Sequence, residues 1–154
     1  MPSNIKVKLK ENISSILSEK DLIEVAKDAL LASKDNVRKK TKSGINPNQN
    51  GGRYQEYSDN YKKKKGSSTV DLRLKGTLDS GDFFIRKNKK SASLLFRGNN
   101  DKGIKNGFLF AIHQRGIGNN PKRPIFPESK DQIPKVVIDA IFNSLKKKIS
   151  KNTK

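Results

Sequence analysis

Apolar side chains recur every three or four residues in a long segment near the N-terminal end of the chain. This spacing covers residues 19–39 and is typical of an amphipathic helix. The segment follows Ser18 and Asp21, which have the spacing of a capping-box variant. The pattern therefore predicts a first helix that begins at residue 19 and packs one face on the core.

The same helical spacing returns near the C-terminal end, between Ile133 and Ile149. Pro134 would occupy the first turn, after a cap at Ser129 or Asp131. Several lysines stand at the end of this segment, where positive charge interacts favourably with the helix dipole. A second amphipathic helix is therefore predicted, and residues 151–154 form a basic tail after it.

The middle of the chain has the alternating pattern of strands. Residues 82–87 and 92–97 flank a polar turn at 88–91 and predict an antiparallel hairpin. Shorter alternating stretches at 5–9 and 70–75 are each consistent with a strand or an extended segment. These patterns predict an α+β domain, with two helices packed on an antiparallel sheet of three to five strands.

Two further segments of the C-terminal half are less regular. Residues 108–112 form an apolar block, which is too short for its periodicity to distinguish a strand from a buried helical turn. Glycine and proline recur over 116–127 and predict an extended loop. We expect one domain over residues 1–154, with an N-terminal arm at 1–17 and long protruding loops.

The longest predicted loop, residues 41–69, is rich in Gly, Asn, Ser and Lys but contains three tyrosines. A passive connection of this length is uncommon in a compact domain, so the loop is either disordered or functional. Tyr54, Tyr57 and Tyr61 are three and four residues apart, which would place them along one side of a short helix. They would anchor against a partner or pack on the chain's own core, and the sequence leaves both alternatives open.

The charge of the chain first suggests a nucleic-acid partner. The 154 residues include 34 Lys plus Arg against 15 Asp plus Glu, a formal net charge of +19. However, 27 of the cations are Lys and only 7 are Arg, and Arg is the residue whose planar fork binds phosphate and guanine bidentately. Lys62–Lys65 are either a phosphate-binding patch or a solvated run of like charges.

Little in the sequence suggests catalysis, and we expect no enzyme activity, cofactor or metal. The chain has no cysteine and one histidine, so thiolate zinc sites and cysteine nucleophiles are excluded. His113 with Arg115, Lys122 and Arg123 offers a ribonuclease hypothesis, in which the cations stabilise the transition state. No apolar run has the length of a membrane span, so no membrane partner is expected.

The order of short motifs along the chain is more specific than any one of them. A Tyr-x-x-x-Tyr pair (Tyr57–Tyr61) precedes the Val-Asp-Leu-x-Leu-x-Gly segment of residues 70–76. The hairpin follows, and then Ala-Ile-His-Gln-x-Gly at residues 111–116 and the pair Arg123-Pro124 before the last helix. Over residues 19–150 this order resembles the virion morphogenesis and tail-completion proteins of tailed, Mu-like phages.

The chain also departs from that pattern in two places. Ile125 stands between Pro124 and Phe126, and an Asn-Asn-Pro insertion follows Gly116.

The resemblance implies a structural virion protein that is assembled from the host cytoplasm into the neck or tail. It would form a ring of six copies, or a multiple, between portal or adaptor and tail proteins, as a head–tail joining, tail-completion or terminator component. Its basic surface would contact packaged DNA without reading sequence, Lys62–Lys65 being the residues proposed to face it.

His113 would fix the Gly116 loop through hydrogen bonds from its ring to backbone groups. The residues expected at subunit interfaces or as loop anchors are Tyr54, Tyr57, Tyr61, Leu72, Leu74, His113, Arg123 and Phe126. The alternative is a basic nucleic-acid-binding protein, with the ribonuclease as a third hypothesis.

Overall fold

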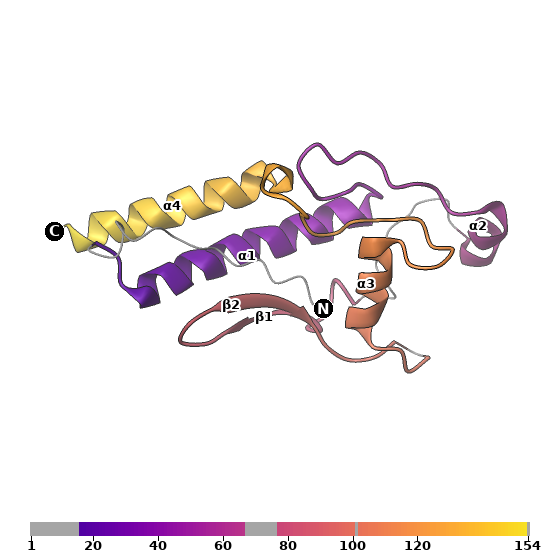
Figure 1. Cartoon of the computed structure of the whole chain (residues 1–154), viewed down its shortest axis with the longest axis horizontal. Helices are drawn as coiled ribbons and strands as arrows, with labels where there is room; N and C mark the ends of the chain where they lie inside the picture. The colour runs from indigo at the N-terminus through magenta and orange to yellow at the C-terminus, as the bar shows by residue number, and fades with distance from the viewer. Residues whose placement is uncertain (1–15, 67–76, 101, 154) are drawn as a thin grey trace.

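The computed structural model describes residues 16–66, 77–100 and 102–153, and over these residues the chain is α+β (Figure 1). Within these described residues, four helices and one two-stranded sheet follow one another, with a short 3-10 turn before the last helix. They are α1 (Glu19–Lys42), α2 (Asp59–Lys65), β1 (Phe83–Lys87), β2 (Ala92–Phe96), α3 (Asn106–Arg115), the turn Lys130–Gln132 and α4 (Lys135–Asn152).

The predicted start of α1 is confirmed, and its cap is a complete capping box. The Ser18 hydroxyl accepts from the Asp21 backbone N–H at 3.1 Å, and the Asp21 carboxylate accepts from the Ser18 backbone N–H at 3.1 Å. The helix runs to Lys42, three residues beyond the predicted end, because Thr41 continues its buried face. The Thr41 hydroxyl donates to the Val37 carbonyl at 2.6 Å, which satisfies this buried side chain.

The capping box predicts a pH-dependent stability. Hydrogen bonds from the Ser18 side chain and backbone lower the pKa of Asp21 from 3.8 to about 2. A carboxyl whose folded pKa is depressed stabilises the fold above its unfolded pKa, and this contribution is lost as the pH falls from about 4 towards 2. Asp21→Asn is therefore expected to lower the Tm at pH 6, with a difference that shrinks towards pH 2 in a thermal melt series. A difference independent of pH would contradict this role.

Helices α1 and α4 lie side by side in antiparallel orientation (Figure 1). The Ser144 hydroxyl donates to Asp28 at 2.6 Å, and Lys148 lies 3.5 Å from Asp21. Helix α4 is the second predicted helix, but the predicted caps at Ser129 and Asp131 are wrong. Pro134 occupies the N-cap position, where its hydrocarbon ring can make no cap bond, and Ser129 and Asp131 belong to the 3-10 turn before it.

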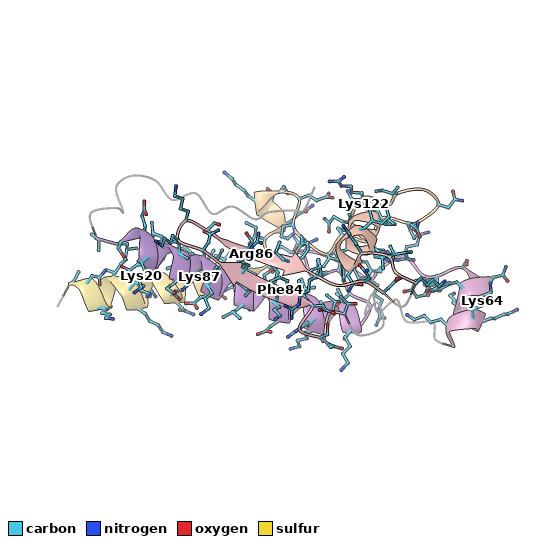
Figure 2. All side chains as sticks on the ribbon, turned by 90° about the horizontal axis from the view of Figure 1, so that it is seen from below. Lys20, Lys64, Phe84, Arg86, Lys87 and Lys122 are labelled. Atoms are coloured by element: carbon cyan, nitrogen blue, oxygen red, sulfur yellow. The ribbon has the colours of Figure 1, made fainter. Side chains whose placement is uncertain are left out.

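The hairpin of β1 and β2 is confirmed, and it lies across one face of α1. Phe83 pairs with Phe96 and Lys87 with Ala92, around a turn held by the Asn88 side chain. Lys87 forms an ion pair with Glu24 on α1, which places Phe83, Ile85 and Lys87 on the face towards that helix. Figure 2 shows the hairpin in front of α1, with Phe84 and Arg86 labelled; by strand alternation they share the opposite face.

The described residues contain two strands of the three to five predicted. The predicted strands at 5–9 and 70–75 lie outside the described residues. Residues 108–112 belong to helix α3, whose first residue, Asn106, is bonded to the end of the hairpin. Its backbone N–H donates to the Gly98 carbonyl and its side-chain amide to the Arg97 carbonyl, at 3.1 and 3.0 Å.

Stacked aromatic rings connect these elements into one core. The Phe96 ring stacks on Phe83 and on Phe110, with centroid distances of 4.6 and 3.8 Å and nearly parallel planes. Phe126 packs against the same rings from the loop that follows α3. The core also includes Val37 of α1 and Leu78 and Ile125 of the loops. Among the described helices, none is long and apolar enough to cross a bilayer.

Candidate assembly interface

Six of the eight residues expected at interfaces or as loop anchors lie in one part of the fold, where α3 and two loops meet. They are Tyr54, Tyr57, Tyr61, His113, Arg123 and Phe126. The other two, Leu72 and Leu74, lie outside the described residues. The six come from segments up to about seventy positions apart, so only the tertiary structure brings them together.

Tyr54 and Phe126 are core residues of the protomer rather than surface groups. Tyr54 is buried, and its hydroxyl donates to the Pro124 carbonyl at 2.9 Å, which ties the loop before α2 to the loop after α3. Burial raises the pKa of the Tyr54 hydroxyl, so it stays protonated as a donor at neutral pH. For Tyr54, packing on the chain's own core is therefore correct.

The predicted single helix carrying all three tyrosines is wrong. Helix α2 begins at Asp59, after the N-cap Ser58, and contains only Tyr61. Tyr54 and Tyr57 precede it in a segment without regular structure, because Tyr54 is held to Pro124 and Arg123 binds the Gln55 carbonyl.

Four side chains form what we call the Tyr57–Arg123 cluster: Tyr57, Tyr61, Lys65 and Arg123. The Arg123 guanidinium lies 4.8 Å from the centre of the Tyr57 ring, and the Lys65 ammonium lies 4.7 Å from it. The two tyrosine rings are themselves 4.7 Å apart. Cations over an aromatic face are attracted by its quadrupole, so this cluster holds α2 against the rest of the protein.

Arg123 is a structural cation. It is 3% exposed, and its Nη2 donates to the Gln55 carbonyl at 3.1 Å. Burial lowers the pKa of Arg123, but an arginine keeps its charge in proteins. The cost of burying this charge is offset by the carbonyl and the Tyr57 ring.

The loop after α3 is held by Gln114 and by Gly116. The Gln114 side-chain oxygen accepts from the Ile125 and Phe126 N–H groups at 2.7 and 3.0 Å, and its amide donates to the Phe126 carbonyl at 2.9 Å. Gly116 ends α3 with a φ of +67°, and a Cβ there would lie 2.9 Å from the Lys122 nitrogen. From the sequence, Gln114 is recognised only as a residue of the Ala-Ile-His-Gln-x-Gly motif, and its buried hydrogen bonds are not predicted. Its position between two apolar segments of the chain is the signal that could have indicated burial.

His113 does not play the role that was expected of it. Its ring Nδ1 is buried without a hydrogen-bond partner, and it is the backbone carbonyl that accepts from the Arg123 N–H at 2.7 Å. Burial, and then the charge of Arg123, lower the pKa of the imidazole, so it is neutral at pH 7. Lys122, one of the cations of the ribonuclease hypothesis, is paired with Glu128 at 2.8 Å.

The four lysines of α2 are not equivalent. Lys62 forms ion pairs with Glu56 at 2.6 Å and Asp59 at 3.5 Å, which raise the pKa of its ammonium group. Lys65 contacts the Tyr57 ring and hydroxyl. Lys63 and Lys64 are exposed, and Figure 2 shows Lys64 at the end of the molecule. Only these two are placed to meet an external phosphate.

The described residues contain no group of three acidic or histidine side chains that could hold a metal ion. Asp82, near the middle of the chain, is paired with Arg97 at 3.3 Å. Comparisons of the chain with protein-family models, curated proteins and solved structures find no match.

Proposed function

We propose that this chain is a structural subunit of a tailed-phage virion, which forms a ring of six copies or a multiple in the head–tail joining region. The observation that carries the proposal is that one small protomer exposes an aromatic side chain on α2 and apolar side chains on α4, at separate places. Tyr61 on α2 is 50% exposed and Phe142 on α4 is 59% exposed. Helix α2 lies at one end of the long axis, and α4 runs to the other (Figure 1).

The exposed surface of α4 is a continuous stripe. Ile138, Phe142, Leu145 and Ile149 are four, three and four residues apart and share one side of the helix. Val137 and Ser144, which belong to the neighbouring side, are the buried residues of the helix and lie towards α1. Within the described residues Ile138, Phe142 and Ile149 are exposed and Leu145 is half-buried, so this apolar side of α4 is largely open.

A cyclic ring needs two different complementary surfaces on each subunit. The α4 stripe and the α2 end are separate, so one copy can contact two neighbours at once. Burial of both surfaces in the ring would add apolar contacts that the protomer's small core lacks.

The motif residues behind the phage resemblance also fit a structural role. Gln114 binds the backbone of the next loop, Gly116 permits its close approach, and Arg123 connects it to Tyr57, just before α2. In this protomer they shape a surface rather than present reactive groups. Because the residues of the most specific motif have structural roles in the protomer, they support the proposal of a non-enzymatic assembly protein.

Phe142→Asp tests the proposed ring. A carboxylate in a desolvated apolar contact is strongly unfavourable, so the variant is expected to abolish the oligomer in sedimentation velocity and native mass spectrometry. Because Phe142 is exposed in the protomer, the Tm of the variant should differ by less than about 3 °C from that of the unchanged protein at a concentration where the latter is monomeric. Asn143→Asp places the same charge on the adjacent, exposed position and should keep the oligomer. A ring that survives Phe142→Asp would contradict the use of this stripe.

The second candidate is a nucleic-acid-binding function, favoured by the exposed Lys63 and Lys64 on a chain of charge +19. If these lysines contact phosphates, replacing both with Gln should reduce the slope of log affinity against log salt by about two on duplex DNA. The pair Lys89→Gln and Lys90→Gln removes the same charge from the exposed hairpin turn and serves as the control. Equal slopes for both double variants would contradict a DNA contact at α2.

A further inference from the structure

The outer edge of β2 carries backbone groups that the hairpin does not use. The Arg97 backbone N–H donates to the Asp82 carbonyl, and the Asn88 backbone N–H donates to the Ser91 carbonyl. These two bonds show which residue pairs of the β1–β2 ladder are the hydrogen-bonded ones. In an antiparallel pair, hydrogen-bonded and non-hydrogen-bonded positions alternate. Ser93 and Leu95 therefore face β1, while the N–H and C=O groups of Leu94 and Phe96 point away from it.

Nothing in the described residues covers this edge with a further strand. The sheet of the described residues is β1–β2 alone, and no described backbone or side-chain group is hydrogen-bonded to the Leu94 or Phe96 backbone. An open strand edge is a template for pairing with an extended chain.

An apolar groove lies beside the same strand. It has a volume of about 320 Å³, and β2, α3 and the loop after α3 line it. We call it the β2–α3 groove, defined by Leu94, Leu95, Phe96, Phe108, Phe110 and Ala111. Phe108 stands on α3 and is 57% exposed, so the groove has an aromatic wall that the described part of the chain leaves uncovered.

The cations around the groove indicate which kind of partner segment it would bind. Arg115 is the one charged residue that lines it. From residue 102 to residue 127 the sequence has five cations and no carboxylate. Lys122 is paired with Glu128 and Arg123 is buried, which leaves Lys102, Lys105 and Arg115 to attract an acidic partner. A second copy of this Lys-rich chain would bring more positive charge to this surface, whereas an acidic segment would be attracted to it.

We infer that the β2 edge and the β2–α3 groove bind an extended segment of another protein, in which apolar side chains alternate with carboxylates. The segment adds as a third strand through the free groups of Leu94 and Phe96. Alternate side chains enter the groove against Phe108, and the carboxylates between them point to the other face of the added strand, where the net positive charge of the protein attracts them. This surface differs from the α4 stripe and the α2 end, so the inference stands whether or not the chain forms a ring.

Amide hydrogen exchange by NMR tests the inference, because strand addition leaves an alternating signature. The probe is a capped eight-residue peptide of alternating valine and glutamate, added to the full chain. The Leu94 and Phe96 amides are expected to exchange about tenfold more slowly with the peptide, as for a newly formed hydrogen bond. Ser93 and Leu95, already bonded to β1, should not change, and Phe108→Ser should abolish the effect. Leu31→Ser, an exposed apolar position on α1, should not.

Several outcomes would overturn the inference. They are no protection of Leu94 and Phe96 at millimolar peptide, equal protection by a valine–lysine peptide, or persistence of the effect in Phe108→Ser. Protection that rises with protein concentration alone would assign the edge to a second copy. Amides protected at every concentration without peptide would assign it to a segment of this chain. Either result would overturn the assignment to another protein.

Discussion

Phe83→Ala is expected to lower the free energy of unfolding by about 4 kcal/mol, a large part of the stability of a domain of this size. Phe83 is completely buried, and its ring stacks on Phe96 and packs near Phe126. The Lys34 and Arg38 side chains of α1 also lie over it, at 5.9 and 6.0 Å. Alanine would leave a cavity at the point where α1, the hairpin and the loop after α3 meet.

The adjacent Phe84 provides a matched control. It has the same side chain on the same strand, but it lies on the sheet face turned away from α1, where it is half-buried under Arg97. Phe84→Ala should cost less than half as much in urea unfolding. A Phe83→Ala variant whose Tm falls by less than about 5 °C would contradict the position of the core.

Gln114→Ala has the second largest expected effect, about 3 kcal/mol. The change removes the acceptor for two buried backbone N–H groups, those of Ile125 and Phe126, and an unsatisfied buried donor costs about 1–3 kcal/mol. The Phe126 carbonyl still accepts a hydrogen bond from the Asn48 side-chain amide in the variant. The loss of stability therefore comes mainly from the two backbone N–H groups left without an acceptor.

Hydrogen exchange and chemical denaturation would measure this effect together. The Ile125 and Phe126 amides should exchange faster in Gln114→Ala, and the denaturation midpoint should fall. Gln55→Ala is the matched control, because Gln55 is exposed and uses only its backbone carbonyl to bind Arg123. Unchanged exchange at both amides would show that Gln114 is not the clasp of this loop.

The elements with strong local signals could be predicted from the sequence. Ser18 and Asp21 fix the start of α1, and alternation around residues 88–91 fixes the hairpin. Residues 108–112 could not be assigned, because five apolar residues fit either period. The structure resolves them as a helix that begins at Asn106, where this side chain bonds to the end of β2.

The candidate site was less predictable, because its contacts join distant segments. Nothing near Tyr54 in the sequence indicates that its hydroxyl binds the Pro124 carbonyl, seventy positions away. Likewise, Lys62–Lys65 form one uniform run in the sequence. In the structure Lys62 pairs with Glu56 and Lys65 contacts the Tyr57 ring, whereas Lys63 and Lys64 are exposed. The identities of the surface residues were available from the sequence, but their partners depend on tertiary packing.

The central proposal is that copies of this chain close into a ring that joins phage heads to tails. Electron microscopy of the purified protein, together with a head–tail complementation assay, tests it most directly. The account predicts closed rings of six copies or a multiple, which restore the joining of heads to tails and are lost in Phe142→Asp. A protein that stays monomeric at all concentrations and fails to join heads or tails would contradict it.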